Sequence, residues 1–318
     1  MSLFFGTTID GLQMGLCFAV IALGVYISYS ILDFPDLSVD GTFPLGGVVS
    51  TVFMLKIGMN PLLAIILSFF VGMIAGAVTG VLHVKFKISN LLSGIIVMTA
   101  LLSVNLALTK FLTRTGYTTT IFSYRSENLE GIFSGKLAEL FGKGAKDYMV
   151  IAMLFVIVIV LKTAVDLFLK TKAGYMLRAT GDNERVAVTL AKNAGNYKIF
   201  GLALANGFVA MSGAIYSQLF MSYDNNSGTG KAVLALASVI IGTAIFSNIK
   251  FIKDTTAVVI GAIVYSLCLN YLVLVDKDGI YLKLLNAVLF ALILIFNNKI
   301  SAFLHKRSVS KGGKKDHA

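Results

Sequence analysis

Few side chains in this sequence have the types and spacing that chemistry at a reaction centre requires. None of the three histidines is spaced with Cys, Asp or Glu in the way that metal ligands are. Residues 227–233, SGTGKAV, look like the end of a phosphate-binding loop. The first glycine of that motif would fall on Asn225, however, and Ala232 stands where a hydroxyl residue should follow the lysine. We predict no catalytic residue, no metal site and no cofactor or ATP site on this chain.

The acidic residues that do stand out lie in residues 31–47, ILDFPDLSVDGTFPLGG. Two of the three prolines fall in this segment, together with three of the sixteen acidic residues, Asp33, Asp36 and Asp40. The apolar run that follows, residues 45–55, is too short to cross a bilayer alone, so a spanning helix has to recruit residues from about Asp36. Acids and irregular backbone at that depth are tolerated where they line a protein interior or a water-filled cavity.

Two interpretations of this segment stay open. In the first, it lines a translocation path, and the residues expected along the path are Asp36, Asp40, Thr42, Phe43 and Pro44. In the second, it is an ordinary cytoplasmic turn, in which the three acids are solvated and the prolines only end helices. We take the first as the working prediction.

The elements that must position these residues are membrane helices. Hydrophobic residues make up 57% of the chain, charged residues 14%, and mean hydropathy is +0.84. Continuous apolar runs favour helices over a barrel, and we predict an all-α polytopic fold with about nine spans of roughly 20 residues each. The expected spans are residues 11–32, 36–56 as a broken helix, 61–84, 88–111, 148–170, 201–220, 232–249, 254–275 and 281–298.

Small and polar residues inside the spans predict dense helix packing. Gly72, Gly76 and Gly80 recur at four-residue spacing, which permits close helix approach. Several polar side chains could contact solute, but hydrogen bonds across helices are the favoured interpretation for each of them. These residues are Asn105, Asn206, Gln218, Asn270 and Asn286.

The positions of Lys and Arg predict the orientation. The turns 85–87 and 250–253, the loop 162–200 and the tail 299–318 hold seventeen of the 27 basic residues. By the positive-inside rule these parts are cytoplasmic, which leaves the N-terminus and the insert 112–147 outside. The net charge of +11 then reflects topology and contact with anionic lipid headgroups. Nucleic-acid binding is not expected, because the basic residues are scattered over membrane loops.

The most polar internal loop, residues 171–199, is expected to dock a partner. Its residues 183–193 have the pattern of a short helix, and Asp182 is placed to cap its N-terminus. The alternative is a solvated surface helix that touches nothing. We treat the whole chain, residues 1–318, as a single transmembrane domain.

The order of these features resembles the permease subunits of bacterial ABC importers of the branched-chain amino acid and simple-sugar type. The resemblance covers roughly residues 8–298 and is strongest in GYMLRATGDNERVAVTLAKNAGNYKI and the following GLALANGFVAMSGAIYSQLF. It is closest to the branch associated with aromatic amino acid uptake. The insert 112–147 departs from the family pattern.

The resemblance implies a permease architecture of the type II kind and a transport subunit that is not itself an enzyme. The implied partners are an ATP-binding cassette ATPase that binds the ATP, a second permease subunit, expected as a homodimer, an extracytoplasmic solute-binding protein and membrane lipid. The loop would carry a coupling helix that seats in a groove of the ATPase. The residues implied for coupling are Gly181, Asp182, Asn183, Glu184, Arg185, Ala187 and Leu190.

The expected function is import of a small polar solute across the bacterial cytoplasmic membrane by alternating access. An amino acid is the expected solute, and an aromatic one is suggested by the resemblance alone. The alternative is a secondary transporter driven by an ion gradient, which would also use a broken helix and an intramembrane acid. That class is disfavoured because the second half of the chain has no matching acid-rich segment. A membrane-embedded enzyme has no nucleophile–base pair or metal cluster to recommend it.

Overall fold

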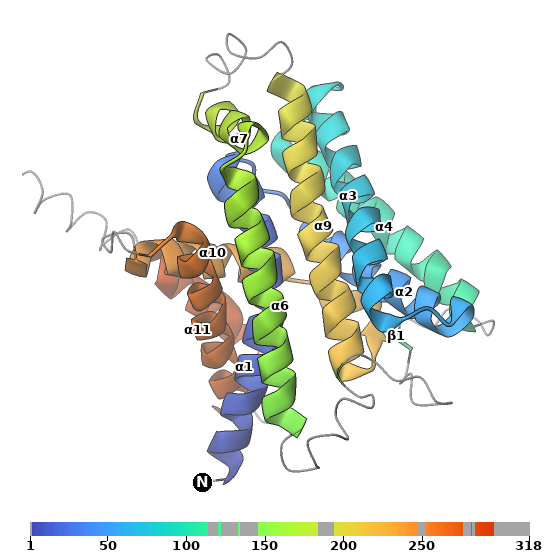
Figure 1. Cartoon of the computed structure of the whole chain (residues 1–318), viewed down its shortest axis with the longest axis vertical. Helices are drawn as coiled ribbons and strands as arrows, with labels where there is room; N and C mark the ends of the chain where they lie inside the picture. The colour runs from blue at the N-terminus through green and yellow to red at the C-terminus, as the bar shows by residue number, and fades with distance from the viewer. Residues whose placement is uncertain are drawn as a thin grey trace, which may run out of the picture.

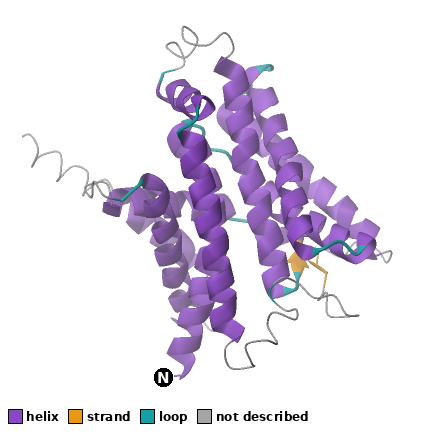
Figure 2. Cartoon of the chain, viewed as in Figure 1, coloured by secondary structure: helices purple, strands orange, loops and turns teal. Residues whose placement is uncertain are grey.

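Helices make up nearly all of the structure, a computed structural model that describes residues 2–113, 120–121, 133, 146–183, 194–246, 252–275, 281 and 284–295 (Figure 2). The elements, in chain order, are α1 (Ser2–Val25), the π-helix η1 (Tyr26–Ile31), α2 (Val39–Ile57), α3 (Pro61–Val84), α4 (Asn90–Thr113), β1 (Thr120–Ile121), α6 (Lys146–Leu169), α7 (Lys172–Asp182), α9 (Ala194–Phe220), β2 (Tyr223–Asp224), the 3-10 turn η2 (Asn225–Gly228), α10 (Lys231–Phe246) and α11 (Asp254–Val275). The strands β1 and β2 form an antiparallel pair in which Thr120 lies opposite Asp224.

Seven helical segments among the described residues are long and apolar enough to cross a membrane. They overlap seven of the predicted spans, and the predicted all-α polytopic class is confirmed. The count of about nine spans is not confirmed. The helix α2, with 19 residues, falls outside this set, and the apolar helix Leu284–Ile295 is shorter than a bilayer crossing requires.

The segment predicted as a broken helix, residues 36–56, differs from the prediction in where the break lies. The helix α2 is continuous and contains Pro44, whereas the chain leaves regular helix earlier, in η1 and the turn at residues 32–38. Because Pro44 has no N–H, the carbonyl of Asp40 lacks its helical donor. This carbonyl lies against Gly228, where any side chain would overlap it.

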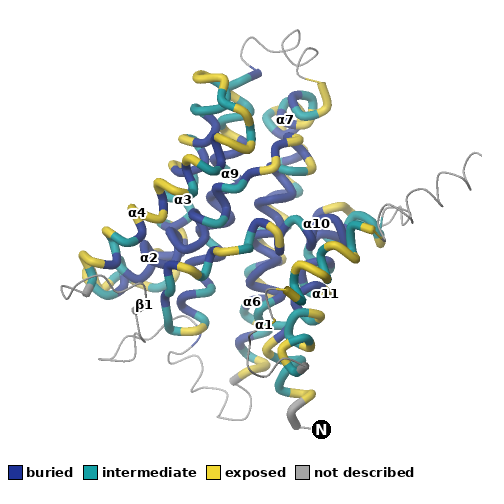
Figure 3. The backbone as a smooth tube through the Cα atoms, turned by 180° about the vertical axis from the view of Figure 1, so that it is seen from behind, coloured by how far each residue is buried: buried dark blue, intermediate teal, exposed yellow. Residues whose placement is uncertain are grey.

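The helices α1 and α9 are the most deeply buried of the candidate spans; α3 packs along α9, α6 along α1, and α4 along α2 (Figure 3). The most apolar windows of α1 and α9 are 83% and 72% buried, against 22% for α6. The predicted glycine stripe packs α3 along α9, since a methyl group on Gly72, Gly76 or Gly80 would overlap the α9 backbone. The prediction that this stripe permits close helix approach is confirmed.

The bundle has two distinct ends (Figure 1). The helix α7 lies at one end, where Asp166 near the end of α6 binds Lys253 just before α11. The N-terminus and β1 lie at the opposite end, where the hydroxyls of Thr8 and Tyr271 are 2.8 Å apart and join α1 to α11. We call these the α7 end and the β1 end.

Candidate translocation path and coupling site

The predicted path segment meets α9 at Asp36. Asn206 Nδ2 donates to Asp36 Oδ2 at 2.7 Å, and the backbone N–H of Ser38 donates to Asp36 Oδ1 at 2.8 Å. Ser38 Oγ closes the set by donating to Asn206 Oδ1 at 3.2 Å. Asp36 is only 7% exposed, Asp40 is partly buried, and of the three acids only Asp33 is exposed. The alternative of a turn whose three acids are all solvated therefore does not fit Asp36.

Asp40 reaches across to the N-terminus of α10. Its Oδ2 accepts from the backbone N–H of Gly230 at 3.0 Å, and its Oδ1 accepts from that of Ala232 at 2.7 Å. A carboxylate there satisfies N–H groups that have no partner within their own helix and complements the helix dipole. The string SGTGKAV, which only superficially looks like a phosphate-binding loop, thus presents its amides to a carboxylate of this chain.

The remaining predicted path residues are buried in α2. The hydroxyl of Thr42 donates to the carbonyl of Ser38 at 3.0 Å. Phe43 is 1% exposed, and its ring centroid lies 5.5 Å from that of Tyr216 in α9. Pro44 packs near Gly228 of η2. The structure thus places all five predicted path residues inside the protein, and it brings Asp40 and Phe43 together around α10.

The first turn of α10 carries a cation that sequence reasoning did not single out. The ammonium of Lys231 lies 4.0 Å from the ring centroid of Phe18 and 5.4 Å from that of Phe43. It lies 5.5 Å from the ring of Tyr216. The sequence shows only a lysine at the start of an apolar segment, and such a lysine usually marks where a membrane span begins. Only the fold shows which rings surround it.

The predicted coupling residues lie at the α7 end, but only three of them are described. The helix α7 ends at Asp182, and Asn183 is extended, with φ −156° and ψ 102°. The prediction that a helix begins at Asn183 with Asp182 in front of it is therefore wrong at its start. Both residues are exposed, whereas Gly181 lies against the carbonyl of Ile31 in η1. Glu184, Arg185, Ala187 and Leu190 lie outside the described residues, as does the rest of the predicted helix.

The helix α7 was not predicted, although its start has a recognisable cap. Thr171 Oγ1 accepts from the backbone N–H of Gly174 at 3.3 Å. Leu177 is fully buried, and it packs beside Leu32 over Gly201 of α9, where a methyl group would overlap both leucines. Two glycines, Gly174 and Gly181, lie within this stretch and disfavour a helix, so the sequence by itself indicates a loop. Tertiary packing through Leu177 stabilises the helix.

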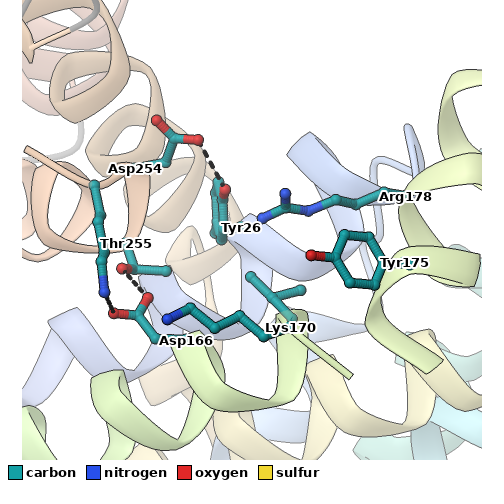
Figure 4. Close-up of a pocket in the computed structure, with 9 residues that line it drawn as sticks. Tyr26, Asp166, Lys170, Tyr175, Arg178, Asp254 and Thr255 are labelled. Atoms are coloured by element: carbon teal, nitrogen blue, oxygen red, sulfur yellow. Dashed lines mark hydrogen bonds and ion pairs between the residues drawn. The ribbon is translucent and has the colours of Figure 1, made fainter. Parts of the chain in front are cut away.

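A cavity of about 350 Å³ lies beside α7, between the end of α6, η1 and the start of α11 (Figure 4). Asp166 makes three polar contacts at this cavity. It accepts a hydrogen bond from Thr255 Oγ1 and forms ion pairs with Lys253 at 3.1 Å and Lys162 at 2.9 Å. Tyr26 in η1 donates to Asp254 Oδ2 at 3.2 Å. These bonds connect α6, α11 and η1 at the end of the molecule where α7 lies.

Comparison with known proteins identifies the family. The family model described as "Branched-chain amino acid transport system / permease component" matches residues 7–297. The chain is 38% identical to the tyrosine transport system permease protein of Clostridioides difficile (strain R20291), over 91% of this chain and 91% of the relative. It is 26% identical to the ribose import permease protein RbsC of Escherichia coli (strain K12), over 83% of this chain and 77% of the relative. No solved structure matches the chain. The chain therefore belongs to this family, and it is a multi-pass membrane protein that serves as the permease component of an ABC transport system.

Proposed function

We propose that this permease imports an aromatic amino acid into a bacterial cell, across the cytoplasmic membrane, at the expense of ATP hydrolysed by a separate ATPase subunit. The observation that carries the proposal is the 38% identity, over 91% of both chains, to a protein named as a tyrosine transport system permease. The ribose permeases are more distant, at 26% identity. An amino acid is therefore favoured over a sugar.

The proposed assembly contains two copies of this chain, an ATPase pair at the α7 end and a solute-binding protein at the β1 end. The α7 end would be cytoplasmic, and the N-terminus would lie outside. In alternating access, closure of the ATPase pair shifts the permease between two states. Leu177 supports a mechanical role for α7, because it is buried beside Leu32, just after η1, over Gly201 of α9. Movement of the residues that follow α7 would reach the central helix α9 directly.

The test combines uptake with partner retention in one set of variants. In cells that express the complete transporter, we expect L-tyrosine uptake that stops when ATP is depleted and persists when the ion gradients are collapsed. The double substitution Glu184→Lys, Arg185→Glu keeps the net charge but reverses both charges in the coupling loop. We expect it to abolish co-purification of the ATPase and to lower uptake at least tenfold.

The matched control is Lys146→Glu, Asp147→Lys, which reverses an adjacent pair at the start of α6, at the β1 end. This variant should retain both the ATPase and uptake. Uptake that survives ATP depletion but not ionophore would instead identify an ion-driven transporter. If the loop variant keeps its ATPase as well as the control does, residues 184–185 have no part in coupling.

A further inference from the structure

Lys231 lies in a group of aromatic side chains from three helices. Its ammonium is within 6 Å of the ring centroids of Phe18 in α1, Phe43 in α2 and Tyr216 in α9. The rings also pack on one another. The ring centroids of Phe18 and Tyr216 are 6.0 Å apart, and the two ring planes are nearly parallel. Lys231 itself is partly exposed. We call these four residues the Lys231 cluster.

The Lys231 cluster lies within the candidate membrane spans, at the middle of the first span and near the ends of those that carry Tyr216 and Lys231. Phe18 is at the middle of the apolar segment Phe4–Ile31, the first candidate span. At about 1.5 Å per residue, the ring is roughly 20 Å from either end of that segment. Lysine is unfavourable inside a membrane span, so one that is kept there is expected to face a partner or a cavity.

Within the part of the chain that the structure describes, no carboxylate oxygen lies within salt-bridge distance of the Lys231 ammonium, although the charge of Asp40 attracts it from farther away. Among the described residues, Lys231 makes no ion pair and no side-chain hydrogen bond. The neighbouring acid, Asp40, points both oxygens at the backbone N–H groups of Gly230 and Ala232. Ring faces attract the cation, but they do not replace the oxygen acceptors that its three N–H donors can take. The cluster therefore holds a cation that is oriented and still able to bind an anion.

An apolar surface continues from the cation toward the β1 end. Phe220, one turn after Tyr216 in α9, is 41% exposed, and the two ring centroids are 4.6 Å apart. A ligand with a carboxylate at one end and an aromatic ring at the other could bind Lys231 and stack against Phe220 simultaneously. A site that combines a charge-assisted hydrogen bond with a ring contact selects ligands that carry both a carboxylate and an aromatic ring.

We propose that Lys231 binds the carboxylate of the transported solute, with the solute's aromatic ring against Tyr216 and Phe220. The Lys231 cluster is then a solute site on the path. This inference deepens the proposed import of an aromatic amino acid and rests on it for the identity of the solute.

The direct test is ligand-observed saturation-transfer NMR on the purified full chain in nanodiscs. The probes are L-tyrosine, 3-(4-hydroxyphenyl)propionate, which keeps the carboxylate but lacks the amine, and tyramine, which keeps the amine but lacks the carboxylate. We expect both carboxylate probes to bind, and tyramine to bind at least tenfold more weakly. Equal binding of tyramine, or no binding of either carboxylate probe, would overturn the proposal.

Three variants test whether the preference for carboxylate probes comes from the ammonium of Lys231. Lys231→Met keeps a long apolar side chain against the rings, and we expect it to lose the preference for carboxylate probes. Lys231→Arg should keep the preference and shows that the position tolerates substitution. The control is Lys56→Met, because Lys56 also lies over an aromatic ring, Phe111 at 5.9 Å, but at the exposed end of α2. A preference that survives in Lys231→Met would refute a solute contact.

The two proposals fail in different ways. If cells do not take up L-tyrosine but the purified chain still prefers carboxylate probes through Lys231, the proposed solute is wrong and the carboxylate site stands. If uptake is ATP-dependent and Lys231→Met supports it at the wild-type rate, the import function stands and the site does not.

Discussion

Asn206 is the residue on which the buried polar contacts of the path segment depend. Its amide donates to Asp36 and accepts from Ser38, and its removal deprives the buried Asp36 carboxylate of a hydrogen-bond donor. An unsatisfied buried group of this kind costs about 1–3 kcal/mol. We expect Asn206→Ala to lower the free energy of unfolding by about 2 kcal/mol, measured as a fall in the thermal midpoint of the detergent-solubilised protein.

The control for this substitution is Asn270→Ala. Asn270 is also an amide inside a span, but it is partly exposed and donates only to Met14 Sδ and to a carbonyl of its own helix. Its replacement should shift the midpoint by much less. Equal shifts for the two variants would mean that the contact with Asp36 contributes nothing to stability.

Residue types could be predicted from the sequence here, but their partners could not. Asn206 bonds outside its own helix to Asp36, in the turn before α2, and the interpretation of the intramembrane amides as cross-helix hydrogen bonds is confirmed for Gln218, which donates to Ser50 Oγ at 2.9 Å. In the first pair the partners are 170 positions apart in the chain, and in the second 168. Nothing local specifies such a pairing. For the same reason Lys231 was passed over, since its aromatic neighbours come from three helices.

At the scale of elements, the contact between α3 and α9 depends on glycine. A methyl group on Gly76 would overlap the carbonyl of Leu202, so the two helices would have to separate. Overpacking of this kind costs about 1–3 kcal/mol. We expect Gly76→Ala to lower the thermal midpoint of the detergent-solubilised protein, although alanine favours helix over glycine by about 1 kcal/mol.

Gly6→Ala in α1 provides the matched substitution, because nothing lies within 4 Å of the added methyl group. This variant gains the helix propensity without the overlap, so it should be as stable as the unmodified protein or slightly more stable. The argument from close packing would be refuted if Gly76→Ala behaved in the same way as Gly6→Ala.

Long elements were predictable for a physical reason, and short ones were not. Apolar runs of about 20 residues have one stable solution in lipid, which is why α3, α6 and α11 fall close to their predicted ranges. The helix α7 has only three buried residues and depends on Leu177 packing into a space that Gly201 leaves open. The cavity beside it was missed as well, because Asp166 meets Thr255 only through the fold.

At the scale of the whole molecule, the bundle has an α7 end and a β1 end, and the import proposal requires the α7 end to be cytoplasmic. Single cysteines placed in a Cys17→Ala, Cys268→Ala background test this directly. Lys56→Cys is exposed at the end of α2, and Lys172→Cys is exposed at the start of α7. A membrane-impermeant maleimide should label Lys56→Cys in spheroplasts, and Lys172→Cys only after permeabilisation.

The reason for this expectation is that most of the basic residues in the described part of the chain lie at the α7 end. Lys85→Cys, exposed in the turn between α3 and α4, provides an independent site on the same side and should behave as Lys172→Cys does. Labelling of both in intact spheroplasts would place α7 outside the cell, where no ATP is available to a partner ATPase. The coupling role of residues 181–190 and the import direction would then both fail, whereas the Lys231 cluster, which lies between the two ends, would keep its chemistry in either orientation.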